Sequence, residues 1–435
     1  MSYNATLGDS KNIYFKYTFL CLALSTWMLI PIIGIFPILL FIHFNSRRES
    51  FVQKTINTVL LLLVIITVSI FGTLITYQVD TVVYLNAYND CGAYTISYCL
   101  ENAKFEPLFY LIAYPIFKIS GGSEIVFLML WSFLINCLMV FLVCNSISSK
   151  KYKYICLILI FLSPAFYVQN FLMRQYMANT LLLSAIAIKE NRFLFYFLIL
   201  LAILSHSAIL LLVPLLFIDY SVVLRVFKNS KNIKRVSIIL STLLLTISIF
   251  GKIDYSSLGT INSLFASTFI ESKTNYNLDT QLESIDFKGI LFLLIPIGLL
   301  YFLISSKKSS CEILQVNSND QKSQNQKLQT LILIYMVLLS LFLLTINLGF
   351  LPYRLSLMLL SYTGLFFLPF FEKDSNLGTK SKQILIVLIC ILYFSYFIYF
   401  LYNVSNGNNP NNYVDGKPFT KSIFDYIQML IESPN

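Results

Sequence analysis

Four ionisable side chains stand within or at the edges of long apolar stretches of this sequence: Glu106, Arg174, His206 and Arg354. An arginine presents a planar fork of N–H groups that fits phosphate oxygens, whereas lysine acts as a point charge. Lysine dominates the basic loops of the chain, yet arginine occupies both of these positions. The choice of residue type indicates a site for a phosphate-bearing ligand.

Each of these residues also has an ordinary explanation. An arginine at the end of a membrane-spanning helix often extends into the lipid headgroups, which would account for Arg174 and for Arg354 separately. Glu106 precedes Pro107, which suits a first helical turn, so its carboxylate could simply complement a helix N-terminus. Both explanations stay open for the single residues. A shared location of all four favours a site.

The elements that must position these residues are membrane helices. Hydrophobic residues make up 57% of the chain, charged residues 12%, and the mean hydropathy is +0.74. No soluble core of 435 residues hides so much apolar surface, so the sequence predicts an all-α, polytopic integral membrane protein. Several apolar runs reach the roughly 20 residues that a spanning helix needs. The runs are 17–43, 56–78, 124–145, 154–170, 174–188, 193–218, 236–251, 289–304, 329–347, 353–371 and 384–402.

Basic loops give the orientation, because cytoplasmic loops carry an excess of Lys and Arg. The basic loops are 44–55, 146–153, 189–192, 219–235, 305–328 and 372–383. The chain must therefore turn on the outer side near Arg174, and all four candidate residues fall toward that side. The net charge of +10 reflects membrane topology, and nucleic acid is not an expected partner.

Run 193–218 has basic residues at both ends, so we expect it to cross twice with a turn near Ser205-His206-Ser207. Each arm would span only ~20 Å, short of the ~30 Å hydrocarbon layer, which predicts a re-entrant pair. Broken helices of this kind commonly line binding sites. With the pair, the chain makes about 12 crossings. The alternative is one tilted helix of 26 residues, which would invert every later loop.

The sequence predicts a single transmembrane domain, residues 1–402, followed by an outer tail, 403–435. Its outer loops are 79–123 and 252–288, and loop 305–328 is polar and cytoplasmic. The stretch 105–117 reads as a re-entrant or interfacial helix that begins at Pro107. Cys91 and Cys99 share an outer loop, where an oxidising compartment would permit a disulfide. In the tail, apolar residues at helical spacing predict an interfacial amphipathic helix: Phe419, Ile423, Phe424, Ile427 and Ile431.

Several short motifs occur in a characteristic order. They are an acidic, Tyr-rich segment with Asp80, Tyr84 and Tyr88, then EPLFY, FLMRQYMA, LSHSAILLLVPL and LPYRLSL. This order resembles the EpsG-type, Wzy-like family of bacterial polysaccharide polymerases. The likeness covers roughly residues 56–225 by motif and the remainder by hydropathy. One departure is Gln78 in YQVD, where such proteins often carry an arginine.

The resemblance implies a glycosyltransferase with a GT-C-like architecture in the bacterial inner membrane, acting on the periplasmic face in O-antigen-type synthesis. It would transfer a glycan from undecaprenyl diphosphate to a sugar hydroxyl of another lipid-linked repeat unit, in contact with the lipid bilayer and with a chain-length regulator protein. The implied catalytic residues are Glu106 as base, Asp80 in reserve, and His206. The implied diphosphate ligands are Arg174, Arg354 and His206. Tyrosines of the outer loop could stack on sugar faces or serve only as interfacial anchors, and Tyr84 and Tyr110 are the predicted sugar-binding residues; the full set is Tyr84, Tyr88, Tyr94, Tyr98, Tyr110 and Tyr114. No cofactor or metal is expected.

Two other functions stay open. A related ligase would hand the glycan to lipid A, and the sequence does not separate these acceptors. A flippase or transporter of the same lipid-linked glycan would predict charges along a path through the membrane midplane and an internal repeat. The sequence shows no such repeat.

Overall fold

A computed structural model describes residues 3–46, 50–74, 79–101, 103–147, 149–217, 327, 330–331, 333–335, 337–342, 350–373, 379–405 and 417–432. Every regular element in these ranges is helical, which confirms the all-α prediction. The chain forms two compact units, residues 1–211 with 368–435, and residues 212–367. The predicted boundary at residue 402 stays a prediction, and the outer loop 252–288 and the polar loop 305–328 lie outside the described ranges.

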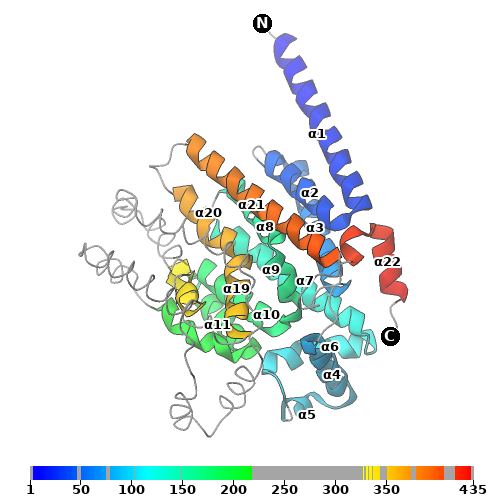
Figure 1. The fold of residues 1–435 in the computed structure, drawn as a ribbon, viewed down its shortest axis with the longest axis vertical. Helices are drawn as coiled ribbons and strands as arrows, with labels where there is room; N and C mark the ends of the chain where they lie inside the picture. The colour runs from blue at the N-terminus through cyan, green and yellow to red at the C-terminus, as the bar shows by residue number, and fades with distance from the viewer. Residues whose placement is uncertain are drawn as a thin grey trace, which may run out of the picture. The chain divides into compact units, whose positions relative to one another are not determined.

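Most of the described helices belong to the first unit (Figure 1). They are α1 (Tyr3–Leu29), α2 (Pro31–Asn45), α3 (Phe51–Leu74), α4 (Val79–Ala93), α5 (Ile96–Glu101), α6 (Pro107–Ser120), α7 (Glu124–Ser146), α8 (Lys150–Leu162), α9 (Pro164–Val168), η1 (Gln169–Phe171), α10 (Met173–Ala187), α11 (Arg192–Ser205), η2 (Ser207–Leu211), α21 (Thr379–Ser405), η5 (Lys417–Thr420) and α22 (Ile423–Glu432). The second unit contains η3 (Val213–Leu216) and α19 (Phe350–Ser361). Helix α20 (Thr363–Lys373) begins in the second unit and ends in the first.

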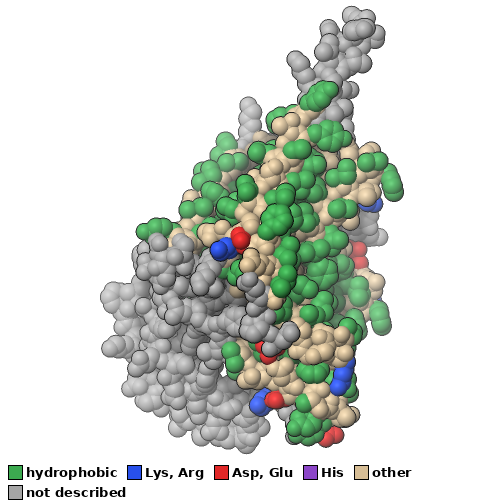
Figure 2. Space-filling model, turned by 90° about the vertical axis from the view of Figure 1, so that its right-hand side faces the viewer, with side chains coloured by type: hydrophobic (Ala, Val, Ile, Leu, Met, Phe, Trp, Pro, Cys, Tyr) green, Lys and Arg blue, Asp and Glu red, His purple; other side chains and the backbone are tan. Residues whose placement is uncertain are grey.

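Among the residues that the structure describes, three helices are long and apolar enough to cross a membrane: α3, α7, and residues Ser381–Tyr402 of α21. Shorter apolar helices accompany them, among them α2, α6 and α11. On the face shown in Figure 2, hydrophobic side chains cover much of the coloured surface and charged ones are scattered, a composition that a lipid environment accommodates. The chain is therefore an all-helical membrane protein, while the count of 12 crossings and the GT-C-like architecture stay predictions.

The first apolar run differs from its expected form. Residues 17–43 were predicted to form one crossing, but the helix breaks before Pro31, and α1 and α2 contact one another. Pro31 has no N–H to continue the helical ladder and is preorganised for a first turn, so a new helix begins there. Gly34 permits the close approach, because a Cβ at this position would lie 2.2 Å from Cα of Trp27.

Helix α10 is the central helix of the first unit, in contact with both α7 and α11. Every one of its residues is buried except Arg174 and Gln175. The buried residues include the polar side chains of Asn179, Thr180 and Ser184, so this helix is enclosed on all sides by its neighbours. The one charged residue of α10 therefore stands at the edge of the most enclosed helix of the unit.

A buried polar contact links two of the candidate membrane spans. Asn136 Nδ2 of α7 donates hydrogen bonds to Ser69 Oγ of α3 (3.1 Å) and to Ser132 Oγ of its own helix (3.3 Å). Interhelical bonds of this type contribute about 0.6 kcal/mol each in membrane proteins. The bond helps fix the register of α3 against α7, which in turn supports α10.

The carboxyl-terminal tail contains a helix, α22, with Phe424, Ile427 and Ile431 exposed. Phe419, expected on the same apolar face, lies in η5 before this helix. Two neighbouring aromatic residues attach the tail to the bundle: Phe419 and Tyr426 are buried, and the ring of Phe419 lies 4.6 Å from that of Phe71. The placement of α22 on a membrane interface stays a prediction.

Candidate functional site

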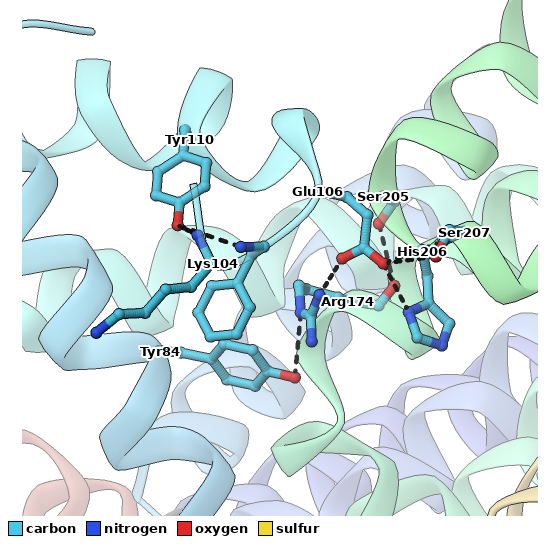
Figure 3. Close-up of polar contacts among 9 residues, drawn as sticks. Tyr84, Lys104, Glu106, Tyr110, Arg174, Ser205, His206 and Ser207 are labelled. Atoms are coloured by element: carbon cyan, nitrogen blue, oxygen red, sulfur yellow. Dashed lines mark hydrogen bonds and ion pairs between the residues drawn. The ribbon is translucent and has the colours of Figure 1, made fainter. Parts of the chain in front are cut away.

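Glu106 occupies the N-cap position of α6, and Pro107 is the first helical residue, as the sequence predicted. The Glu106 side chain does not bond the N–H groups of its own helix. It reaches Arg174 of α10, His206, and Ser207 of η2 instead (Figure 3). The simple explanation, in which this carboxylate only complements a helix N-terminus, is therefore wrong as a full account of its contacts.

Arg174 lies in the first turn of α10, just after the helical geometry of the backbone is interrupted. Leu172 leaves helical geometry (φ −89°, ψ 48°), and α10 begins at Met173. Ser205 Oγ, at the end of α11, donates a hydrogen bond to the Arg174 carbonyl oxygen at 3.0 Å. This bond holds the start of α10 against the end of α11.

His206 marks the break in run 193–218. The α-helix ends at Ser205, His206 is extended (φ −158°, ψ 111°), and the 3₁₀ helix η2 begins at Ser207. The break falls within the predicted tripeptide, so the alternative of one continuous helix is wrong. The return of the chain across the membrane after this break stays a prediction.

The start of α6, the start of α10 and the interruption at His206 meet at the Glu106 carboxylate. Glu106 Oε2 accepts from Arg174 Nη1. Glu106 Oε1 accepts from the backbone N–H and the hydroxyl of Ser207, both at 3.1 Å, and lies 3.4 Å from His206 Nδ1. Figure 3 shows the arginine on one side of the carboxylate and the His206 ring on the other. Three of the four contacts crowd Oε1, while Oε2 has the Arg174 contact alone.

Aromatic rings hold the guanidinium of Arg174. Its Cζ lies 4.2 Å from the ring centroid of Phe105 and 5.4 Å from that of Tyr84. Its Nε donates to the Tyr84 hydroxyl at 3.5 Å. Cation–π contacts of this kind contribute about 0.5–2 kcal/mol, more where water is excluded. The guanidinium plane is thus fixed by two rings as well as by Glu106.

The electrostatics keep Glu106 ionised. Burial by itself raises the pKa of this carboxyl. Hydrogen bonding to His206, the charge of Arg174 and the Ser207 N–H act against burial, and together they hold the pKa of Glu106 well below its ordinary value. The side chains of Glu106 and Arg174 are only 11% and 15% exposed, so water screens the pair weakly. Glu106 is a fixed negative charge at neutral pH.

The other predicted site residues lie as follows. Asp80 is in the first turn of α4, one helical turn before Tyr84. Tyr84 and Tyr110 are buried, and the Tyr110 hydroxyl accepts from the backbone N–H groups of Lys104 (3.0 Å) and Phe105 (3.3 Å). With both rings buried, neither tyrosine offers an open face to a sugar in this structure. Arg354 belongs to α19 of the second unit, and its part in diphosphate binding stays a prediction.

Three residues contribute contacts to the site that the sequence did not predict: Ser205, Ser207 and Phe105. The two serines flank the predicted break at His206, and serine beside a helix end commonly bonds backbone or side-chain groups there. That signal was available in the sequence. Nothing in the sequence predicted the contact of Phe105 with Arg174, because the chain has 38 phenylalanines and none is marked as a cation–π partner by its type.

Two predictions concern cysteine and metal. Cys91 and Cys99 are both free thiols, and Cys99 Sγ lies 3.2 Å from the Cys91 carbonyl oxygen. Within the described ranges, no group of three or more His, Cys, Asp or Glu residues has the arrangement of a metal site. The donors around Glu106 are instead cationic or N–H groups, which suit an anion.

Fold and site together define a class of protein: an all-helical membrane protein in which Arg, His and Ser donors surround one carboxylate. Residues 57–414 match the model of the EpsG family, so the chain belongs to this family. The EpsG family is a Wzy-like, polymerase-type family, and membership indicates a function in polysaccharide biosynthesis at a membrane. No significant match was found among curated proteins or among solved structures.

Proposed function

We propose that this protein is a polysaccharide polymerase of the O-antigen type. It transfers a glycan from undecaprenyl diphosphate to a sugar hydroxyl of another lipid-linked repeat unit, on the periplasmic face of the bacterial inner membrane. The observation that carries the proposal is the cluster of Glu106, Arg174, His206 and Ser207, which joins three helix ends at one point. Family membership supports the same class of reaction.

Arg174 is the proposed diphosphate ligand. A guanidinium has five N–H donors, and its contacts to Glu106 and Tyr84 use two of them. The remaining donors suit the phosphate oxygens, on which negative charge increases as the glycosidic bond to the diphosphate breaks. Because Glu106 and the two rings already hold the guanidinium in place, little reorganisation accompanies the reaction.

His206 is the proposed base, and Glu106 orients it. Glu106 itself would be a weak base, because Arg174 pairs with its carboxylate and its pKa is lowered. The ring of His206 faces Glu106 through Nδ1. In the proposed step, the acceptor hydroxyl oxygen attacks the anomeric carbon, its proton passes to His206 Nε2, and the bond to the lipid diphosphate breaks. Asp80 and Arg354 remain candidates for supporting roles.

The experiment uses a deletion strain complemented with variants, together with purified protein supplied with lipid-linked oligosaccharide. We expect His206→Ala to lower the rate of polymer formation by ~10²–10⁴-fold, and added imidazole to restore part of it. Glu124→Gln is a matched control, because Glu124 forms an exposed hydrogen bond with Asn89 (2.6 Å). Its activity should equal that of the wild type.

Two outcomes would overturn the proposal. Full polymer formation by His206→Ala would remove the base assignment. A deletion strain that loses all glycan attached to lipid A, rather than only the long chains, would indicate a ligase or a flippase. Loss of long chains with single repeat units still attached indicates a polymerase.

A further inference from the structure

Two tyrosines outside the cluster present their rings to solvent. Tyr94 and Tyr98 are 53% and 46% exposed, and their ring centroids lie 4.4 Å apart at an interplanar angle of 34°. Tyr94 follows the end of α4, and Tyr98 lies on α5. The tyrosines at 84, 88 and 110 in the same part of the chain are buried. An exposed, mutually packed pair in this region therefore needs its own explanation.

The corner that carries the pair is held firmly. A Cβ at Gly92 would lie 2.2 Å from the ring of Phe117, so only glycine fits where α4 meets α6. Lys118 Nζ donates to the Gly92 carbonyl oxygen at 3.2 Å. Cys99 Sγ makes a further contact, with the Cys91 carbonyl oxygen. A ligand that binds a preformed surface loses less ordering entropy than one that binds a mobile loop.

The segment that carries the pair is mostly polar at its surface. Within residues 89–101 the exposed polar side chains are those of Asn89, Asp90, Thr95, Ser97 and Glu101. Leu100 is the one large exposed aliphatic side chain in that range. The lipid-accessible helices differ, because α21 exposes Ile384, Val387, Leu388 and Ile391 in succession. A tyrosine that served as a lipid anchor would border such an apolar strip.

We propose that Tyr94 and Tyr98 form a carbohydrate-binding platform for the acceptor glycan. The identification of the ligand as the acceptor glycan rests on the proposed polymerase function. A pyranose ring presents a face of C–H groups that packs on the electron-rich face of an aromatic ring. Nearby carboxylates and hydroxyls then bind the sugar hydroxyls. Tyr98 precedes Glu106 by eight residues, so their Cα atoms are at most ~28 Å apart. An oligosaccharide repeat unit can therefore touch both the platform and the cluster.

The test separates binding from turnover. The probe is the repeat-unit oligosaccharide released from its lipid by mild acid, with saturation-transfer NMR on protein in nanodiscs as the binding readout. The Tyr94→Ala/Tyr98→Ala variant should bind this probe at least tenfold more weakly. Its KM for the lipid-linked acceptor should rise by a similar factor, with kcat within twofold of the wild type. Tyr94→Phe/Tyr98→Phe keeps both rings and should retain most binding. Tyr17→Ala, at a tyrosine 61% exposed on α1, is the control and should change nothing.

The outcomes distinguish the two proposals. If the wild type forms polymer but the double alanine variant binds the probe as the wild type does, the platform is refuted and the polymerase function stands. If the wild type binds the probe and the variant does not, while no polymer forms, the platform stands and the polymerase function fails. A double variant that binds the probe normally but inserts poorly into the membrane would show a lipid-anchoring role and refute the platform.

Discussion

The ion pair between Glu106 and Arg174 should be coupled to the stability of the whole first unit. Glu106→Gln removes the charge and keeps the size of the side chain. It leaves the Arg174 guanidinium without its carboxylate in a site where the two side chains are only 11% and 15% exposed. Breaking a buried pair by removing one partner costs about 3–5 kcal/mol. The residual exposure places the expected loss near the lower end of that range.

Arg174→Gln should cost a comparable amount, because it leaves the Glu106 carboxylate with the Ser207 and His206 contacts alone. In the double variant Glu106→Gln/Arg174→Gln, no charge is left unpaired and the two amides can bond one another. We expect the loss of the double variant to fall short of the sum of the single losses by about 2 kcal/mol, within the usual range for residues in contact.

The assay is reversible unfolding of purified protein in mixed micelles, with the four proteins compared at neutral pH. The matched control is the same cycle on the exposed pair Asn89 and Glu124, for which a coupling below about 1 kcal/mol is expected. If the losses at Glu106 and Arg174 are simply additive, the pair makes no direct contact in the folded protein, and the site geometry described here is refuted.

Three further predictions follow from the same contacts. Arg174→Lys keeps the charge but loses the planar fork of N–H donors and the guanidinium contact with the Phe105 ring. Polymer formation by this variant should therefore be nearly as low as that of Arg174→Ala. Full activity would show that Arg174 acts only as a nonspecific charge. Because the folded-state pKa of Glu106 is lowered, its stabilising contribution is complete above the ordinary value of 4.5 and is lost only as the pH falls below it. The difference in unfolding temperature between the wild type and Glu106→Gln should thus persist down to about pH 5 and shrink in more acidic solution, and a difference that disappears already at pH 6 would contradict this. Gly34→Ala should lower the unfolding temperature more than Gly121→Asn, since a Cβ at Gly34 meets the backbone of Trp27 whereas Gly121 (φ 66°) has open space and asparagine tolerates its conformation.

The sequence predicted the elements that depend on local chemistry. Pro107 announced the start of α6, and the basic flanks of run 193–218 required a break, which the structure places at Ser205-His206-Ser207. The break at Pro31 was missed even though the proline was visible, because the apolar run on both sides was continuous. Length and hydropathy alone hide a helix boundary of this kind.

The contacts of the cluster could not be read from the sequence. Glu106 and Arg174 are separated by 68 positions, and Glu106 and Ser207 by 101. The sequence placed Glu106, Arg174 and His206 on one side of the membrane but gave no reason for a direct ion pair. The burial of Tyr84 and Tyr110 was likewise hidden, because tyrosine suits an interface, a sugar site and a core equally well.

One carboxylate joins three helix ends, so the residues at these ends should change together during evolution. The segments EPLFY, FLMRQYMA and LSHSAILLLVPL contribute Glu106, Arg174 and Ser207, and each of these side chains bonds a residue of another segment. A substitution in any one of them leaves charged or polar groups uncompensated in the other two. We therefore expect the three segments to vary as a set among family members. A lineage that changes Glu106 should also change Arg174 and Ser207, and a chimera that exchanges one segment alone should fold poorly, whereas exchange of all three should restore it.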